Sequence, residues 1–195
     1  RADGRLRDAP IYLDSPMAID ASGLMCDFMD EHRLSRAACE AACGVAHYVR
    51  EVEESKALTA DATPKVIISA SGMATGGRVV HHLKRFAPDE RNLILFSGFQ
   101  AAGTRGAALV SGARTIKIHG EHVPVHAEVA NLTMLSAHAD SDELMRWLGA
   151  MQAAPRHVYV THGEPAGAQV LAKRIGEEHG WPCTVPTLGS WGRLA

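Results

Sequence analysis

The sequence predicts an α/β fold with a parallel sheet, followed by a smaller C-terminal segment. Between residues 65 and 111, short apolar runs alternate with helical stretches in the order strand, helix, strand, helix, which is typical of parallel sheets. Hydrophobic residues make up 46% of the 195 residues, so the chain can bury the core of one large or two small domains. After Gly112 the pattern changes, and alternating residues predict an antiparallel hairpin that turns at Gly120.

Each expected strand is a short apolar run that ends at polar or turn-forming residues. In chain order, we expect strands at 10–14, 65–70, 92–97, 115–119, 123–129, 132–136, 157–161 and 182–186. The first of these ends at Asp14, His138 follows the sixth after Ala137, and His162 follows the seventh directly.

The expected helices follow from capping residues and apolar stripes. Ser15 and Pro16 are typical of an N-cap and a first helical residue. We expect helices at 17–32, 34–44, 78–86, 104–111, 142–151 and 166–179. The helix at 142–151 has an apolar stripe made of Leu144, Trp147, Leu148 and Met151. Residues 45–62 show no clear period, and we expect a charged connection there.

Composition excludes several classes of protein. A net charge of -2 and 5% aromatic residues argue against a chain that binds nucleic acid over its whole surface or mainly by base stacking, so any such contact is local. Cys26, Cys39, Cys43 and Cys183 form no Cys-x-x-Cys pair, and we expect small apolar core residues without disulfides. With no signal peptide and no long apolar run, we expect a cytoplasmic protein without a membrane span. The start at Arg1 suggests a chain cut from a larger protein.

Two histidines stand at matching places in the second half of the chain. His138 and His162 each follow a predicted strand, precede a polar loop and a helix, and have an acid two residues later, Asp140 and Glu164. The carboxyl ends of strands are where α/β proteins build their sites. An imidazole there can ligate zinc, move a proton or simply make a structural hydrogen bond, and spacing does not decide among these roles.

A glycine-rich loop between a predicted strand and helix is the second candidate site. Small residues let backbone N–H groups approach an anion, and the helix N-terminus favours negative charge. The candidate phosphate-binding residues are Ser69, Ser71, Gly72, Met73, Thr75, Gly76, Gly77 and Arg78. The loop lacks the Gly-Lys-Ser/Thr of a Walker P-loop, and a plain tight turn explains the pattern equally well.

Other histidine groups favour structural roles. His119, His122 and His126 have a spacing that suggests a metal site, but a turn within the hairpin would put the first two on different faces. His81 and His82 are adjacent and do not share a helix face.

The motifs resemble, in order and over nearly the whole chain, those of metallo-β-lactamase-fold RNA nucleases with a β-CASP domain. The matching segments are Pro-Ile-Tyr-Leu-Asp-Ser-Pro-Met-Ala (10–18), Glu-Ser-Lys-Ala-Leu (54–58), Ser-Ala-Ser-Gly-Met-Ala-Thr-Gly-Gly-Arg (69–78), Gly-Thr-Arg-Gly (103–106), Leu-Ser-Ala-His-Ala-Asp (135–140) and Thr-His-Gly-Glu-Pro (161–165). The resemblance implies a β-CASP domain over residues 1–134 and the C-terminal part of a metallo-β-lactamase αββα domain over 135–195.

The resemblance also implies roles for individual residues. His138, with Asp140 beside it, would assist proton transfer or stabilise the scissile phosphate, and His162 would ligate one of two zinc ions. The loop around Ser71–Gly77 would contact RNA. The family's His-x-His-x-Asp-His motif is missing from these 195 residues, and one histidine does not hold zinc where three or four protein ligands are needed. We therefore expect this chain alone to be inactive and to bind zinc weakly or not at all.

Three functions are consistent with these motifs. The first is an RNA-cleaving enzyme of which this chain is the C-terminal part, and retention of both His138 and His162 favours it. The second is a non-catalytic RNA-binding or scaffold member of the same family. The third is hydrolysis of a small molecule, which the β-CASP segments disfavour. Apolar surface left uncovered by a missing half could also let the chain form a homodimer.

Overall fold

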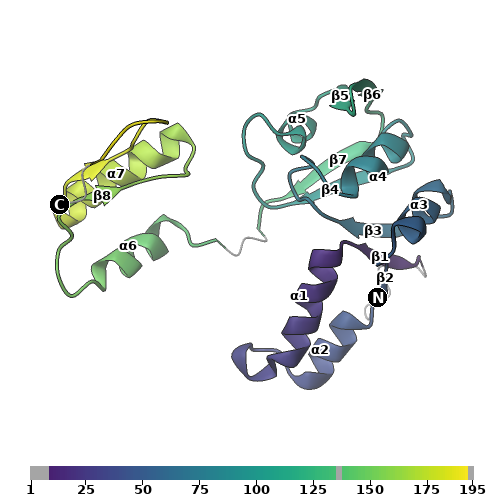
Figure 1. Cartoon of the computed structure of the whole chain (residues 1–195), viewed down its shortest axis with the longest axis horizontal. Helices are drawn as coiled ribbons and strands as arrows, with labels where there is room; N and C mark the ends of the chain where they lie inside the picture. The colour runs from purple at the N-terminus through teal and green to yellow at the C-terminus, as the bar shows by residue number, and fades with distance from the viewer. Residues whose placement is uncertain (1–8, 135–137, 193–195) are drawn as a thin grey trace. The chain divides into compact units, whose positions relative to one another are not determined.

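The computed structural model describes residues 9–134 and 138–192, and the chain divides into two compact units, residues 1–134 and 135–195 (Figure 1). Each unit buries an apolar core of its own. Both contain parallel strands covered by helices, so the predicted α/β class is confirmed.

Two parallel ladders organise the first unit. In one, β1 (Ile11–Asp14) lies between β2 (His47–Tyr48) and β3 (Val66–Ser69). In the other, β4 (Leu93–Ser97) pairs with β7 (Glu128–Leu132). Strands β1, β3 and β4 are short apolar runs that end at Asp14, Ser69 and Ser97, and β3 and β4 each leave alternate side chains exposed.

Helices α4 (Val79–Phe86) and α5 (Arg105–Val110) cover the main apolar core of the first unit. The stripe of α4 buries Val80 and Leu83, three residues apart on one face. They pack with residues of β4, of α5, and of the hairpin and the residue that follows it: Phe96, Leu109, Ile116, Ile118, Val123 and Val125. This core fixes α4, and therefore the loop that leads into α4, against β4.

The predicted hairpin is present but shorter than expected. Strands β5 (Thr115–Ile118) and β6 (Glu121–Pro124) pair antiparallel, and His119 and Gly120 turn the chain with positive φ of 48° and 86°. The single strand expected at 123–129 is wrong. The chain leaves the hairpin after Pro124 and then pairs with β4 as β7, because β4 offers an unpaired edge to apolar residues 129–130.

The strand expected at 132–136 is also wrong where it is described. Strand β7 ends at Leu132, and residues 133 and 134 form a turn. Residues 135 and 136 lie outside the described part of the chain.

The charged connection expected at 45–62 is wrong as well, because it contains β2 and the helix α3 (Val52–Ala60). Glu51 and Glu54 form a capping box that starts α3. Only Ser55 and Leu58 of this helix are buried, so it has no apolar stripe wide enough to show a helical period.

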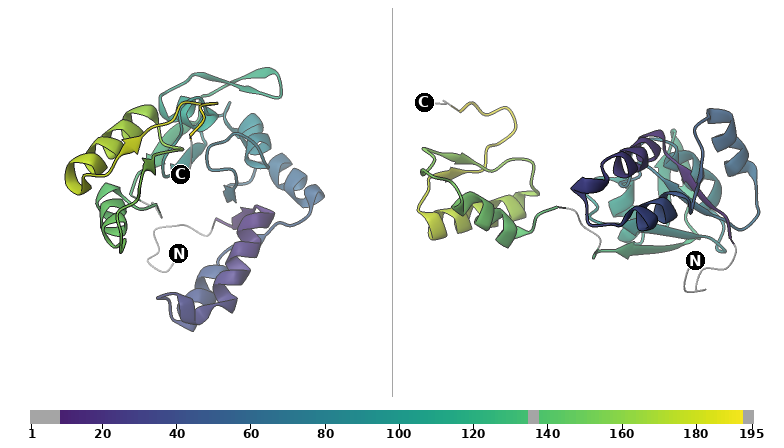
Figure 2. Two further views of the ribbon diagram at one scale, coloured as in Figure 1. Left: turned by 60° about the vertical axis from the view of Figure 1, so that its left-hand side comes forward. Right: turned by 90° about the horizontal axis from the view of Figure 1, so that it is seen from below.

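Helices α1 (Pro16–Asp27) and α2 (Arg36–Cys43), joined through a short 3-10 turn (Met29–Glu31), lie side by side in Figures 1 and 2. The Ser15 hydroxyl accepts a hydrogen bond from Ala18 N at 3.3 Å, so the predicted N-cap is confirmed. The expectation that the cysteines are simple core residues is incomplete. Cys39 is buried, but Cys26 and Cys43 are partly exposed and all three sulfurs converge between the helices.

The second unit is built from α6 (Ser141–Gly149), β8 (Val158–Tyr159), α7 (Pro165–His179) and β9 (Cys183–Thr184), with β8 and β9 parallel. Helix α6 buries Met145 and Leu148, so the predicted stripe is confirmed at Leu148 and wrong at Trp147, which is 67% exposed. Among the described residues, no helix is long and apolar enough to cross a membrane.

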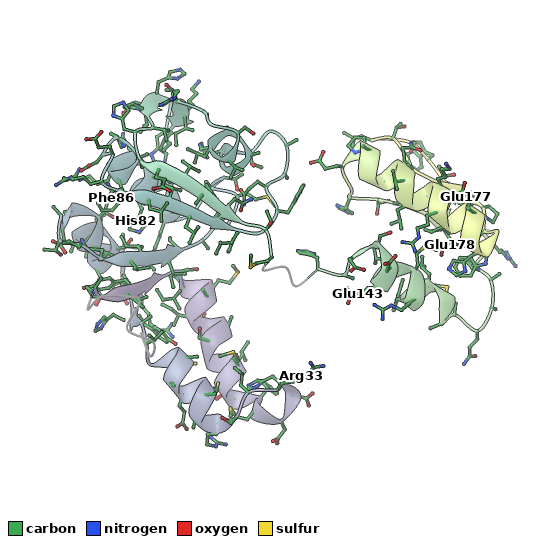
Figure 3. The ribbon with its side chains drawn as sticks, turned by 180° about the vertical axis from the view of Figure 1, so that it is seen from behind. Arg33, His82, Phe86, Glu143, Glu177 and Glu178 are labelled. Atoms are coloured by element: carbon green, nitrogen blue, oxygen red, sulfur yellow. The ribbon has the colours of Figure 1, made fainter. Side chains whose placement is uncertain are left out.

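The buried carboxylate of Asp14, at the carboxyl end of β1, is the polar centre of the first unit. Its Oδ2 accepts hydrogen bonds from Ser55 Oγ of α3 at 2.6 Å and from His82 Nε2 of α4 at 2.7 Å. Its Oδ1 accepts from Arg78 Nη1 at 2.7 Å. Figure 3 shows His82 beside Phe86 on α4, and their rings stack with centroids 6.4 Å apart. One carboxylate therefore joins β1, α3 and the start of α4.

The partners of Asp14 decide the charge of this cluster. Burial alone would raise the pKa of Asp14, but the hydrogen bonds from Ser55, Arg78 and His82 outweigh burial and hold its pKa below the usual value. Burial also lowers the pKa of His82, and this effect outweighs the hydrogen bond to Asp14, which acts in the opposite direction. The folded unit therefore favours an ionised Asp14 and a neutral His82 near neutral pH.

Substitution of Asp14→Asn should lower the free energy of unfolding by about 3 kcal/mol, because Arg78 keeps its charge in a mostly buried place without a counter-ion. Urea denaturation measures this effect. Asp20→Asn is the matched control, since Asp20 pairs with Arg50 on the exposed surface and its loss should cost less than about 1 kcal/mol. Equal losses in the two variants would show that the Asp14 cluster does not stabilise the fold.

Stability should also fall as the pH decreases below about 6.5, the ordinary histidine pKa, because the unfolded chain then binds a proton at His82 that the folded chain resists. A further loss should begin below about 3.9, where Asp14 becomes protonated in the unfolded chain first. Urea midpoints of the wild type and of His82→Gln between pH 7.5 and 5 measure the first effect. The slope of the urea midpoint against pH should flatten in His82→Gln. It should persist in His122→Gln, which changes an exposed residue of β6. An unchanged slope in His82→Gln contradicts this account.

Candidate functional site

The glycine-rich loop after β3 folds back on itself before α4 begins. Ser71 N donates to Gly76 O at 3.3 Å, and Ala74 N donates to Ser71 O at 3.0 Å. The Ser71 hydroxyl accepts from Thr75 N at 3.2 Å. Residues 71–76 are thus a closed turn rather than an open connection.

Side chains from α5 and the segment before it hold this loop through its carbonyl groups. Gln100 Nε2 donates to Gly72 O at 3.1 Å, and Arg105 Nη1 donates to Ala74 O at 2.9 Å and Thr75 O at 3.1 Å. Backbone Gly106 N donates to Met73 O at 3.0 Å. The carbonyl groups of four consecutive loop residues are therefore satisfied within the unit.

Several backbone N–H groups of the same loop, unlike its carbonyl groups, are not hydrogen-bonded within the described part of the unit. Within the described residues, no protein acceptor is hydrogen-bonded to the N–H groups of Gly72, Gly76 or Gly77. A segment whose carbonyls are bound internally and whose amides are free carries the partial charges that suit an anion.

Gly77 is required by the backbone. It has a φ of 76°, and a Cβ atom there would lie 2.6 Å from Ala70 O. Ala74 also has a positive φ, of 54°, although its side chain is fully buried. These constraints keep the turn in one shape, with Ser71 N and Val79 N bonded on either side of it.

A hollow of about 330 Å³ lies against the loop at the carboxyl ends of β3 and β4. Its lining residues are Ser71, Gly72, Met73, Thr75, Ser97, Phe99 and Gln100. Four of these are predicted site residues. Ser97, Phe99 and Gln100 were missed, although their position at the end of the predicted strand 92–97 and just after it is the signal that would have found them.

The other predicted loop residues lie beside the hollow rather than on its lining. Ser69 Oγ donates to the backbone carbonyl of Asp14 at 2.9 Å. Arg78 uses its guanidinium inside the unit, donating to the Asp14 carboxylate and to the carbonyl groups of Val49 at 2.9 Å and Arg50 at 2.6 Å. In the folded unit, these two side chains connect the loop to β1.

His138 and Asp140 lie before α6 in the second unit, and both are exposed. Asp140 is the N-cap of α6: Oδ1 accepts from Glu143 N at 2.8 Å, and Asp140 N donates to Glu143 Oε2 at 3.0 Å. This capping box fixes the direction in which the chain leaves His138 and enters α6.

His162 lies between β8 and α7, three residues beyond the end of β8. It is exposed and has a positive φ of 66°, which is uncommon for a residue with a side chain. Pro165 begins α7 directly after this bend.

The described residues do not complete a zinc site around either histidine. Within residues 9–134 and 138–192, the only group of three or more histidine, cysteine or acidic side chains close enough to share an ion is Cys26, Cys39 and Cys43. A zinc ion needs three or four protein ligands, so the part of the second unit that the structure describes does not supply the zinc site alone.

The remaining histidines have structural surroundings. The ring of His119 contacts that of His81 at 4.9 Å between centroids. His126 Nδ1 lies 3.0 Å from Pro88 O, and His122 lies opposite Lys117 in the hairpin ladder. These three positions of the hairpin region do not converge.

Two family models match this chain. Residues 1–109 match the Beta-Casp domain, and residues 122–186 match the Zn-dependent metallo-hydrolase RNA specificity domain. The second match begins inside the first compact unit.

Three relatives illustrate the similarity. Ribonuclease TTHA0252 of Thermus thermophilus is 39% identical over 88% of this chain and 40% of its own length. The transcription termination factor FttA of Pyrococcus abyssi is 33% identical over 92% of this chain and 29% of its own length. An RNase J-like protein of Methanocaldococcus jannaschii is 30% identical over 96% of this chain and 43% of its own length. The chain therefore spans less than half the length of these relatives, and it belongs to the β-CASP family of metallo-β-lactamase-fold RNA nucleases.

Proposed function

We propose that these residues form the RNA-holding part and part of the catalytic centre of a ribonuclease that uses two zinc ions. The loop at 71–77 binds a phosphate of the RNA backbone, His162 is a ligand to one zinc ion, and His138 with Asp140 handles a proton at the scissile phosphate. The relatives named ribonuclease and RNase J-like support the class of reaction.

One observation carries the proposal for the loop: its carbonyl groups are bound internally while the N–H groups of Gly72, Gly76 and Gly77 have no protein acceptor among the described residues. The hydroxyl groups of Ser71 and Thr75 are hydrogen-bonded to each other at 3.2 Å, so one of the two keeps a proton that it can donate at the hollow. Free amides and hydroxyls bind phosphate oxygens without reading sequence. Arg78 acts in this scheme by positioning, because Asp14 and two carbonyl groups already hold its guanidinium.

The same residues limit what the chain does alone. His162 belongs to no group of three or more possible zinc ligands among the described residues, and we propose that the other ligands lie outside this chain. We therefore expect no RNA cleavage from the isolated chain. A non-catalytic RNA-binding member of the family is the alternative, and it differs in one respect: the longer protein would also fail to cleave.

Cleavage of a labelled RNA by the isolated chain and by the longer protein that contains it tests the function. We expect cleavage only by the longer protein. There, His162→Ala should lower both zinc content and activity, because a ligand is lost. His138→Ala should reduce kcat by about 10²- to 10⁴-fold, the usual effect of losing a proton-transfer group, while zinc content stays unchanged.

The control for this pair is His157→Ala, which changes an exposed histidine near β8 whose Nε2 contacts Thr184 Oγ1. It should leave zinc content and kcat close to wild type. Equal zinc loss in His138→Ala and His162→Ala would contradict the division of roles. RNA cleavage by the isolated chain would contradict the assignment of the missing ligands.

Substitution of Gly77→Ala should weaken RNA binding by the isolated chain about tenfold, equivalent to about 1.4 kcal/mol, because the added Cβ meets Ala70 O and the loop must change shape. Gly76→Ala is the matched control, since nothing lies within 4 Å of its added Cβ and its φ is not positive. Filter binding at one fixed salt concentration measures both variants, with thermal melting to verify the fold. Equal affinities for RNA in the two variants would show that the loop is not part of the RNA-binding surface.

A further inference from the structure

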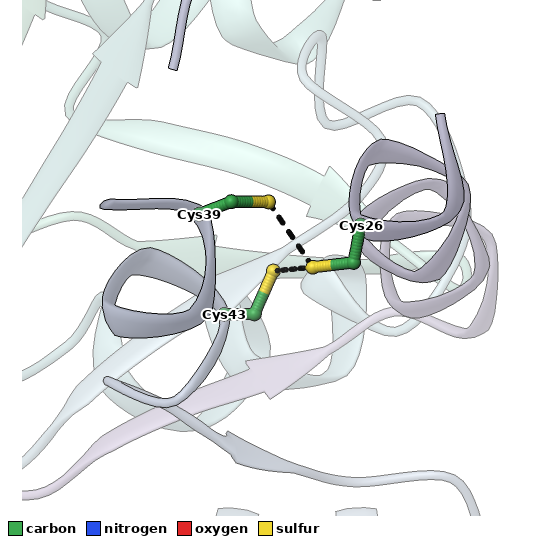
Figure 4. A group of neighbouring side chains, drawn as sticks. All are labelled: Cys26, Cys39 and Cys43. Carbon is green, nitrogen blue, oxygen red and sulfur yellow. Dashed lines mark hydrogen bonds between the residues drawn. The ribbon is translucent and has the colours of Figure 1, made fainter. Parts of the chain in front are cut away.

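Three cysteine thiols meet between α1 and α2 (Figure 4). Cys26 Sγ lies 3.2 Å from Cys39 Sγ and 2.9 Å from Cys43 Sγ, and all three sulfurs lie within 4.8 Å of one another. Cys39 and Cys43 are four residues apart on α2, so successive turns of one helix face present them to Cys26 on α1.

The helix pair has little else to hold it together. Ile19 is the one buried residue of α1, and Cys39 is the one buried residue of α2. Larger apolar side chains of this region point to solvent instead: Leu24 is 57% exposed and Phe28 is 59% exposed. Small scaffolds with so little core are commonly held by a disulfide or by a structural metal ion.

The chemistry of the donors favours a metal ion. Thiolates are soft ligands that select zinc and similar ions, and a Zn–S bond of about 2.3 Å places tetrahedral sulfurs roughly 3.8 Å apart. The thiols are already within 4.8 Å of one another, so an ion would need to move the two closest pairs apart by less than about 1 Å.

The three thiols leave one coordination position unfilled. His32 is the nearest histidine in sequence to Cys26, but its Nε2 lies 2.8 Å from Met25 O and its Nδ1 accepts from Leu34 N at 3.2 Å. Both of its nitrogens are therefore engaged. Cys26 and Cys43 are partly exposed, so solvent reaches the cluster and can supply the fourth ligand.

We propose that Cys26, Cys39 and Cys43 bind one zinc ion through three thiolates, with a solvent molecule as the fourth ligand, and that this ion cross-links α1 to α2. Binding releases the thiol protons to solvent and changes no oxidation state. The site is separate from the zinc ions of the nuclease reaction and requires none of their ligands. The expectation of weak zinc binding considered only the histidines, so the thiol site revises it.

Cobalt titration of the reduced 195-residue chain tests the site, because thiolate-to-cobalt charge-transfer absorption reports sulfur ligands and is absent from a histidine or carboxylate site. We expect this absorption to saturate at about one ion per chain and to disappear when zinc is added in excess. Zinc binding should also raise the thermal melting temperature of the chain.

Variants assign the ligands. Cys26→Ser and Cys43→Ser should lose the absorption and the zinc-dependent rise in melting temperature, whereas Cys183→Ser, which changes the cysteine of β9, should keep both. His162→Ala should also keep both, so failure of the nuclease proposal leaves this test intact. Circular dichroism verifies that the serine variants are folded, and Cys26 and Cys43 are chosen because they are partly exposed.

Two results would overturn the proposal. The first is no charge-transfer absorption from the folded, fully reduced chain. The second is retention of the absorption in both Cys26→Ser and Cys43→Ser. A chain that binds no cobalt when reduced but loses two titratable thiols in air would identify a disulfide pair in place of the metal site.

Discussion

The buried carboxylate of Asp14 is the constraint on which the first unit depends. A carboxylate without solvent contact is stable only where donors surround it, and its donors come from α3, α4 and the residue just before α4. These donors are Ser55, His82 and Arg78, which are 41, 68 and 64 residues away in the chain. Because distant segments must meet at two oxygen atoms, Asp14 fixes where α3 and α4 lie relative to β1.

The same residue holds both ends of the glycine-rich loop. The backbone carbonyl of Asp14 accepts from Ser69 Oγ before the loop, and its carboxylate accepts from Arg78 after the loop. Between these two attachments, Gln100 and Arg105 bind the loop carbonyls from another side. A loop fastened in this way presents its amides with little conformational freedom left to lose, so a bound phosphate would not have to order it.

Local patterns in the sequence predict most of the first unit. The strands that become β1, β3 and β4 are apolar runs between turn residues, and the Ser15 cap marks the start of α1. The errors occur where long-range packing decides. Helix α3 has two buried residues and no period to detect, and β7 leaves the hairpin for the free edge of β4. Helical spacing places Cys39 and Cys43 together, but only the packing of α1 on α2 brings Cys26 to them.

Several residues of the motifs that reveal the family make contacts inside the fold. Asp14, Ser55 and Arg78 belong to three different motif segments, and in the fold Ser55 and Arg78 both donate to the Asp14 carboxylate. The loop also leaves the backbone amides of Gly72, Gly76 and Gly77 without a protein acceptor among the described residues, and a motif does not specify an amide by side-chain type. Gly77 determines the position of these amides indirectly. A Cβ atom there would lie 2.6 Å from Ala70 O, so the loop keeps this shape only with glycine at position 77. In this unit, several motif residues therefore form the framework that holds the glycine-rich loop in place.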